Sequence, residues 1–279
     1  MPGPPPFFLR YGISRTGDPA APLVIEPYPD VCRSGALRPT VLAAAVDTIG
    51  SLFAREVAGR DGIFTTDLSV RSPVRPVPKR IVVRGALLRA GRSLIASEAL
   101  LEVEGAPFAY GQTTFQRVPR KAPAESSGAS EALGLPEVLA HFPLERPLAD
   151  EAGVVVADAS RGRVELPLGP ASLSPQGVMQ GALVALVVEE AALALAEHGD
   201  AGAHVVTELD IRYLAVGREG PIVSSADWVG AREDGTIRVA LRDAGHGNRI
   251  TTAGLARVAR AARTTPPGPE HAPRRTPAR

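Results

Sequence analysis

Two stretches of the chain predict largely apolar helices. From 182 to 196 nearly every residue is Ala, Leu or Val, and only Glu189 and Glu190 interrupt the run. A second apolar helix is predicted from 39 to 55, and it contains one acid, Asp47. A helix that is apolar on every face must be enclosed by other elements. A carboxylate inside it loses hydration, so it needs a partner, a shifted pKa or a place at the rim of a cleft.

Strand-like runs surround each predicted helix in the same order. Two short runs precede each helix, near 7–13 and 21–27 in the first half and near 152–157 and 162–168 in the second. Four longer runs follow each helix, at about 63–74, 79–90, 93–103 and 107–118, then at about 204–214, 221–231, 235–243 and 249–260. Each half therefore consists of two strands, a buried helix and four strands.

The two halves are related by a repeat that is weak in identity but consistent in order and spacing. The segment TDLSVR at 66–71 matches TELDIR at 207–212, which is 141 positions later. Asp47 and Glu189 are 142 positions apart, and so are Gly35 and Gly177, the glycines ahead of the two helices. Self-similarity at a fixed offset indicates duplicated structural units.

The boundary between the halves is predicted from composition. Residues 121–131, KAPAESSGASE, are polar and contain Pro, Ser and Gly, as is typical of a linker. We therefore expect an N-terminal domain over 1–120 and a C-terminal domain over 132–263. Residues 1–6 and the tail 264–279 are rich in Pro and Arg and have little to bury, so both are predicted to be disordered.

The predicted fold class is α+β. A curved antiparallel sheet with one apolar face supplies the cover that a fully apolar helix needs. Two such units in tandem satisfy the repeat. We expect their sheets to join edge to edge into one antiparallel sheet, with both helices on the same side.

The loop, the buried helix and the strand pattern TxLxxxYL from Thr207 to Leu214 resemble the phenylacetyl-CoA and 4-hydroxybenzoyl-CoA thioesterase families. The resemblance covers about 150–262 well and about 20–119 more faintly. It implies two tandem hotdog domains that hydrolyse an acyl thioester of coenzyme A or of a carrier protein, without a cofactor.

These families usually carry Asn, then Gly, then His-Gly-Gly, with an acid nine residues after the His. In the second half the corresponding positions hold Ser174, Gly177, Gln180, Gly181 and Glu189. In the first half they hold Cys32, Gly35, Arg38, Pro39 and Asp47. The Asn and the His are thus replaced in both halves, whereas Glu at the acid position also occurs in the 4-hydroxybenzoyl-CoA branch.

The resemblance implies composite sites, in which the acid on one helix faces the glycine loop and helix start of the other domain. Asp47 would then face Gly181 and Gln180, while Glu189 would face the start of the first helix. Gly177 and Gly181 let the backbone approach a ligand closely, and the free N–H groups of the first helical turn can hold a developing oxyanion.

The second composite site is predicted to be weaker. Glu189 would face Pro39 and Arg38, and proline has no N–H to offer the thioester oxygen. Loss of one such donor typically costs about 10²- to 10³-fold in rate. Ser51, four residues after Asp47, adds a hydroxyl on the same helix face, whereas Leu193 follows Glu189 at that spacing. We therefore expect Asp47 to be the nucleophile or the general base.

Other residues carry weaker expectations. The candidates for substrate contacts are Ser174, Gly177, Thr66, Thr207 and Arg38. Asp47 has an alternative interpretation as a helix acid paired with an arginine, and Gln180 as a residue that ties down its own loop. Glu190 is expected to be solvated or paired, and Cys32 to be packed. Tyr213 and Trp228 are ordinary strand residues that could also line an acyl pocket.

Composition excludes several classes of protein. The net charge of +1, with basic and acidic residues interspersed, gives no field to attract nucleic acid or an anionic membrane. One cysteine excludes an internal disulfide framework, and five dispersed histidines do not predict a metal site. No apolar stretch reaches the length of a membrane span without acids, and no secretory signal is evident. A cytoplasmic protein is the default expectation.

Three classes of function remain open. The first is acyl-CoA thioesterase, with the Gly181 amide polarising the carbonyl. The second is a hotdog dehydratase or hydratase, which would need a His and acid pair in the site. The third is a non-catalytic binder of acyl thioesters or other hydrophobic ligands. Pairs of chains could also associate into a homodimer.

Overall fold

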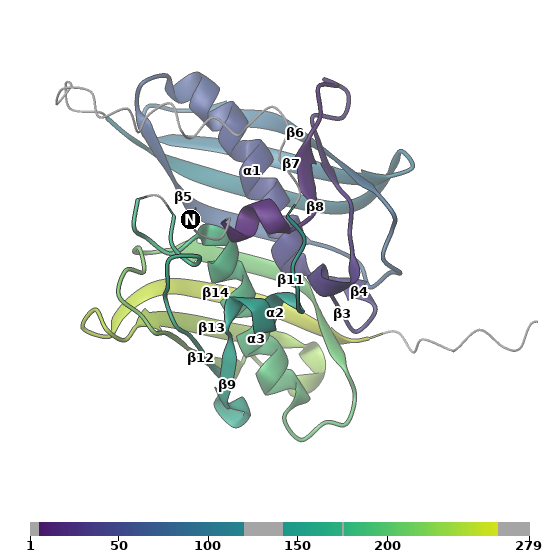
Figure 1. Cartoon of the computed structure of the whole chain (residues 1–279), viewed down its shortest axis with the longest axis vertical. Coiled ribbons are helices and arrows are strands. Elements are labelled where there is room, and N and C mark those ends of the chain that lie inside the picture. Colours follow the sequence, from purple (N-terminus) through teal and green to yellow (C-terminus); the bar gives the residue numbers. More distant parts are fainter. Residues whose placement is uncertain (1–5, 120–141, 175, 262–279) are drawn as a thin grey trace, which may run out of the picture.

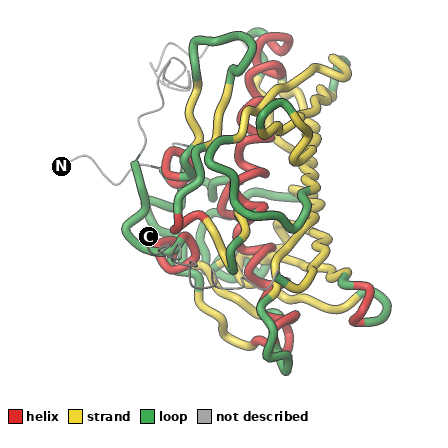
Figure 2. Tube along the Cα trace, turned by 90° about the vertical axis from the view of Figure 1, so that its right-hand side faces the viewer, coloured by secondary structure: helices red, strands yellow, loops and turns green. Residues whose placement is uncertain are grey.

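A continuous antiparallel sheet carries both long helices of the chain on one face (Figure 1). The structure is a computed structural model that describes residues 6–119, 142–174 and 176–261. In the side view of Figure 2 most strands form a layer along one side of the molecule, and the two long helices lie against that layer. Further strand segments lie on the other side of the helices.

The first half contains the helix α1 and the strands that cover it. Its 3-10 turns are η1 (Phe7–Arg10) and η2 (Pro29–Val31), and α1 is Pro39–Ala58. Its strands are β1 (Ile13–Arg15), β2 (Leu23–Ile25), β3 (Cys32–Arg33), β4 (Ala36–Leu37), β5 (Gly62–Arg71), β6 (Ile81–Ala90), β7 (Leu94–Val103) and β8 (Ala106–Val118).

The second half repeats this order around the helix α3. Its helices are α2 (Leu148–Ala152) and α3 (Gly181–Glu197), with 3-10 turns η3 (Ala159–Arg161) and η4 (Arg232–Asp234). Its strands are β9 (Val155–Asp158), β10 (Arg163–Leu166), β11 (His204–Tyr213), β12 (Ile222–Trp228), β13 (Thr236–Asp243) and β14 (Arg249–Arg260). All eight strands predicted after the two helices are present.

The strands of both halves join in one sheet of twelve described strands, in the order β1-β2-β6-β7-β8-β5-β11-β14-β13-β12-β10-β9. The halves meet where β5 pairs antiparallel with β11, and Leu68 lies opposite Ile211. The predicted edge-to-edge sheet with both helices on one side is confirmed.

The prediction of a strand near 7–13 is wrong. Phe7–Arg10 is a 3-10 turn that begins after Pro6, and its first bond runs from the Leu9 N–H to the Pro6 carbonyl. The strand starts only at Ile13, because Gly12 has a positive φ of 71° and lies against the Glu26 carbonyl. Buried Phe7 and Arg10 therefore belong to a turn rather than to a strand face.

The two helices are enclosed for different local reasons. In α3 nearly all side chains are apolar, and both Glu189 and Glu190 are buried. In α1 the approach to the sheet depends on glycine: a Cβ at Gly50 would stand 2.3 Å from the Thr113 hydroxyl, and one at Gly111 would stand 2.6 Å from Val46. Side chains at these two positions would push the helix off the sheet.

Each half carries a bulge near the start of its central strand. The register of β5 against β8 shifts between Thr65 and Asp67, so that Thr66 is the extra residue. The register of β11 against β14 shifts between Val206 and Glu208, so that Thr207 is the extra residue. The repeat therefore includes the bulge. In both strands the extra residue shifts by one position which side chains face the helices.

Two expectations fall partly or wholly outside the described residues. The predicted linker 121–131 and the predicted tail 264–279 lie in the parts of the chain that the structure does not describe, as do residues 1–5. No helix within residues 6–119, 142–174 and 176–261 combines the length and apolar character needed to cross a membrane.

Candidate active site

Asp47 lies on α1 with its carboxylate directed at the strand β5. The Thr65 hydroxyl donates a hydrogen bond of 2.8 Å to the Asp47 Oδ1. Burial raises the pKa of the Asp47 carboxyl, and this rise is opposed by the Thr65 hydrogen bond and by the charge of Arg55. Asp47 is partly buried, and only one donor to its carboxylate is found among the described residues. The carboxylate therefore keeps lone pairs for a further ligand.

The start of α3 offers an unused amide. Gln180 is the N-cap in an extended conformation, and Gly181 is the first helical residue. Within the part of the chain that the structure describes, the Gly181 N–H donates to no backbone or side-chain acceptor. The dipole of the 17-residue helix favours negative charge at this end. The site can thus stabilise an oxyanion.

Tyr213, at the end of β11, contacts the start of α3. Its hydroxyl is 3.4 Å from the Gly181 carbonyl oxygen. Burial raises the pKa of the Tyr213 phenol, and the negative charge of Asp47 raises it further. Tyr213 therefore contacts the start of α3 and lies close enough to Asp47 to feel its charge. Sequence reasoning considered it only as a possible pocket lining.

The loop ahead of α3 is held by its own hydrogen bonds. The Gln180 side-chain amide donates to the carbonyls of Ala171 and Leu173, at 2.7 and 3.3 Å, so this side chain ties down its loop. Gly177 has a positive φ of 69°, and its N–H donates to the Ser174 carbonyl. The Ser174 hydroxyl is buried and has no partner among the described residues.

On α1, the Ser51 hydroxyl donates to the Thr48 carbonyl at 2.9 Å, within its own helix. Its oxygen can still accept a hydrogen bond. Neither Ser51 nor Gln180 makes a hydrogen bond to Asp47 in this structure. The expectation that both act beside Asp47 remains a prediction.

The two bulge threonines face away from the acids. The Thr66 hydroxyl donates to the Thr114 carbonyl at 3.1 Å, and the Thr207 hydroxyl to the Arg257 carbonyl at 3.3 Å. The preceding residue of β5, Thr65, reaches Asp47 instead. A comparison of the two halves could have identified Thr65, because the equivalent residue 141 positions later, Val206, has no hydroxyl.

Glu189 holds the position of Asp47 in the second half of the repeat, and both oxygens of its carboxylate are hydrogen-bonded. Its Oε1 accepts from Arg38 Nη1 at 2.9 Å, and its Oε2 accepts from the Thr40 hydroxyl at 2.6 Å and the Thr40 N–H at 3.3 Å. Glu189 thus faces Arg38 and the start of α1, as the composite pairing implies. Its side chain is only 2% exposed, and burial raises the pKa of its carboxyl.

A network of charges completes this second site. Glu190 is buried and paired, accepting from Arg38 Nη1 at 2.6 Å and from Arg33 Nη1 at 2.9 Å. Arg33 also pairs with Glu197 at 2.8 Å. The cavity beside Glu189 and Pro39 has a volume of only about 10 Å³, which is about the space of one water molecule. An acyl thioester does not fit there without rearrangement.

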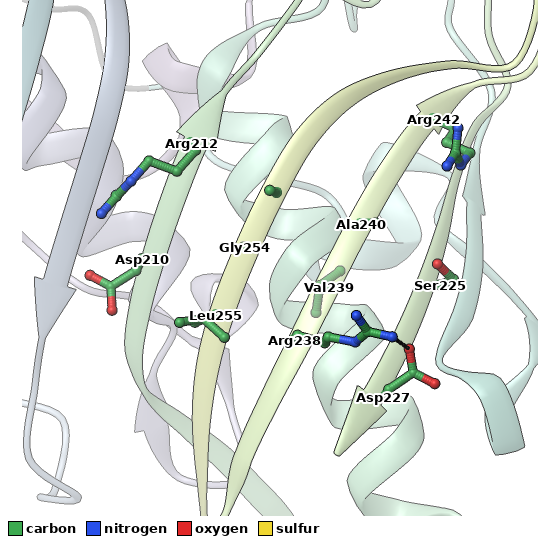
Figure 3. A pocket seen from close by; sticks show the side chains of 11 residues that line it. Asp210, Arg212, Ser225, Asp227, Arg238, Val239, Ala240, Arg242, Gly254 and Leu255 are labelled. Atoms are coloured by element: carbon green, nitrogen blue, oxygen red, sulfur yellow. Dashed lines mark hydrogen bonds and ion pairs between the residues drawn. The ribbon is translucent and has the colours of Figure 1, made fainter. Parts of the chain in front are cut away.

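A larger depression, of about 550 Å³, lies on the opposite face of the sheet. Figure 3 shows its side chains in front of β11 to β14, with a helix behind the strands. Arg238 pairs with Asp227 there, and Arg212 pairs with Asp67. Neither Asp47 nor Glu189 lines this depression, so it is not part of the candidate site.

The described residues do not provide the ligand cluster that a metal site requires. No group of three or more His, Cys, Asp or Glu side chains within residues 6–119, 142–174 and 176–261 is arranged to hold a metal ion.

Comparison with known proteins identifies the fold. No family model and no curated protein matches the sequence. A solved structure from Alicyclobacillus acidocaldarius, described as a conserved protein of unknown function with a hot dog fold, covers 86% of this chain and 93% of its own, with 13% identity and a TM-score of 0.54. The chain has the hotdog fold.

Two further solved structures align with this hotdog chain over most of their length. The acyl-ACP thioesterase of Bacteroides thetaiotaomicron is 13% identical and covers 85% of this chain and 96% of its own, with a TM-score of 0.54. The tesB protein of Mycobacterium avium subspecies paratuberculosis is 12% identical and covers 86% and 93%, with a TM-score of 0.53. At these identities the likeness defines the fold.

Proposed function

We propose that the chain hydrolyses acyl thioesters at the site between Asp47 and Gly181. The observation that carries this proposal is Tyr213, whose phenol contacts the start of α3 and feels the charge of Asp47, the partly buried carboxylate held by Thr65. The Gly181 N–H at that helix start has no acceptor among the described residues. The names of the acyl-ACP thioesterase and other thioesterases of the same fold support this function.

The chemistry requires a base or nucleophile and an oxyanion donor. Asp47 removes a proton from water, or attacks the thioester carbon itself. The raised pKa of Asp47 makes the carboxylate a stronger base than an exposed aspartate. The Gly181 N–H polarises the carbonyl and holds the oxyanion that forms when the carbon becomes tetrahedral. Collapse of this intermediate expels the thiol.

We further propose that only this one of the two composite sites is active. Glu189 is already bonded to Arg38 and Thr40, and the N–H at the first position of α1 is missing because Pro39 stands there. The position of Thr65 is taken by Val206, and that of Ser51 by Leu193. The proline, the valine and the leucine each remove a polar group that the Asp47 site has.

A second candidate is a non-catalytic binder of acyl thioesters. It is favoured by one observation: position 180 holds glutamine, whose amide is used by its own loop. An amide cannot exchange protons as imidazole does. A dehydratase or hydratase is the weaker candidate, because no histidine contacts Asp47 among the described residues.

The organisation of the chain is part of the proposal. We infer two hotdog domains, 1–120 and 132–263, joined by 121–131, and a substrate delivered by coenzyme A or by a carrier protein. Association of two chains into a homodimer and a cytoplasmic location remain expectations from the sequence.

The direct test is release of free thiol from a panel of acyl-CoA esters that ranges from short to long aliphatic and aromatic acyl groups. Turnover of at least one ester by the purified chain is expected. If the chain binds such esters in calorimetry but releases no thiol, the binding function replaces the hydrolytic one.

A further inference from the structure

We propose that the Tyr213 hydroxyl donates a hydrogen bond to the thioester carbonyl oxygen, beside the N–H of Gly181. This inference rests on the proposed function, and it assigns a polar group that sequence reasoning left as a strand residue. Tyr213 would then complete an oxyanion site built from two elements, the end of β11 and the start of α3.

The phenol of Tyr213 lies close to the backbone of Gly181. A Cβ built on Gly181 would stand 3.7 Å from the Tyr213 hydroxyl and 3.8 Å from its Cε1 atom. The phenol therefore lies beside the first residue of α3, whose N–H has no acceptor within the residues that the structure describes. Because Gly181 has no side chain, no Cβ fills the space between the hydroxyl and the backbone of this residue.

The hydroxyl is also available for a ligand. Its bond to the Gly181 carbonyl is 3.4 Å long, beyond the usual range for an O–H donor. In the regular helical pattern that carbonyl also accepts from the N–H of Ala185. Rotation of the hydroxyl towards a ligand oxygen therefore leaves no carbonyl unpaired. Burial and the charge of Asp47 raise the pKa of the phenol, so it keeps its proton at neutral pH.

The other half of the molecule provides a comparison. The residue 141 positions before Tyr213 is Ser72, whose backbone N–H donates to the Thr207 carbonyl. A serine side chain is too short to take the place of a phenol. Glu189 thus lacks this donor as well, and the difference between the two halves extends to the oxyanion side.

Hydrolysis proceeds through a tetrahedral intermediate. The water oxygen bonds to the thioester carbon while Asp47 takes one proton of that water. The electron pair of the C=O bond moves onto the carbonyl oxygen, which accepts from the Tyr213 O–H and the Gly181 N–H. The C=O bond then re-forms, the C–S bond breaks, and the leaving sulfur takes the proton from Asp47. Tyr213 keeps its own proton throughout.

Tyr213→Phe tests this assignment, and Tyr110→Phe is the matched control. Tyr110 lies on the exposed face of β8, where its hydroxyl donates to Glu98. We expect Tyr213→Phe to lower kcat by about 10²-fold with little change in KM, as for loss of one oxyanion donor. Tyr110→Phe should leave both constants unchanged.

Binding of two coenzyme A analogues separates a carbonyl contact from a structural role. In the ketone analogue a methylene replaces the sulfur of the thioester, and in the thioether analogue a methylene replaces the carbonyl. Tyr213→Phe should weaken binding of the ketone about tenfold, which corresponds to one hydrogen bond of about 1.4 kcal/mol. Binding of the thioether should not change.

The outcomes distinguish the two proposals. If Asp47→Asn inactivates the chain but Tyr213→Phe retains full kcat and ketone affinity, the role of Tyr213 is overturned and the hydrolytic function stands. If the chain binds the ketone without hydrolysing any ester, a selective loss in Tyr213→Phe supports the contact while the hydrolytic function fails. If the wild-type chain neither hydrolyses an ester nor binds the ketone, both proposals are overturned.

Discussion

At the scale of single residues, the two acids of the repeat differ in how many of their lone pairs are used. Among the residues that the structure describes, Asp47 accepts one hydrogen bond, from Thr65. Glu189 accepts from Arg38 on one oxygen and from Thr40 on the other. A base must have room and lone pairs for water, so the environment of Asp47 suits catalysis. The environment of Glu189 suits a permanent ion pair.

The Thr65 hydrogen bond should be visible in the pH dependence of activity. A general base works only when it is ionised, so kcat/KM should rise with pH through the raised pKa of Asp47. The Thr65 bond lowers that pKa, and Thr65→Val should therefore move the acid limb of the profile up by about one pH unit.

Thr66→Val is the control, since Thr66 donates to Thr114 rather than to an acid. Its profile should match that of the wild type. A Thr65→Val profile that also matches the wild type would mean that Asp47 is not the group whose ionisation limits the rate.

The sequence predicted the acids but not all of their partners, and the bulge explains one miss. Strand alternation cannot predict which of Thr65 and Thr66 faces the helix until the extra residue of the bulge is located. The matched repeat TDLSVR begins at Thr66, so the prediction named Thr66 and not Thr65. Arg33 was missed because its contact with Glu190 joins residues 157 positions apart. No local pattern encodes that distance.

At the scale of elements, the starts of the two helices differ in whether the first residue has a backbone N–H. Arg38 and Gln180, the N-caps, have nearly the same backbone angles, with φ of −63° and −65° and ψ of 132° and 135°. The next residue is Pro39 in α1 and Gly181 in α3. Proline favours an extended conformation in the residue before it, and both N-caps are extended. Both helices can therefore begin with proline.

Gly181→Pro therefore deletes the N–H with little change in the backbone. We expect thiol release to fall by about 10²- to 10³-fold, the usual cost of one oxyanion donor. Gly181→Ala is the matched control because it keeps the N–H, and its Cβ would make an ordinary contact at 3.7 Å from Tyr213. Equal rates for the two variants would place the oxyanion donor elsewhere.

The elements themselves were largely predictable from the sequence. The apolar runs at 39–55 and 182–196 became α1 and α3, and the longer strands follow the predicted runs within a few residues. Residues 7–13 were not predictable, because alternation cannot distinguish a short strand from a 3-10 turn that buries Phe7 and Arg10.

At the scale of the whole molecule, charges from both halves are buried against each other. Arg38 at the start of α1 meets Glu189 and Glu190 of α3, and its side chain is 4% exposed. Arg10 pairs with Glu151 across the same boundary. The strands β5 and β11 add an exposed pair, Arg212 with Asp67. The buried contacts should hold the halves together far more strongly than the exposed one.

Arg38→Met should accordingly lower the free energy of unfolding by about 3–5 kcal/mol, because it leaves two buried carboxylates without their shared cation. Arg212→Met, which breaks the exposed pair, should cost at most about 1 kcal/mol. Urea unfolding followed by circular dichroism measures both. A similar loss for the two variants would show that the Arg38 network does not stabilise the fold.

Thiol release by Asp47→Asn and by Glu189→Gln, measured on the same acyl-CoA ester, decides which of the two acids is catalytic. Both substitutions keep the shape of the side chain and remove its charge. Asp47→Asn should lose about 10²- to 10⁴-fold in kcat, as expected for loss of a general base, while Glu189→Gln should retain more activity than it loses. Inactivation by Glu189→Gln with an active Asp47→Asn would contradict the account and move the chemistry to the other site.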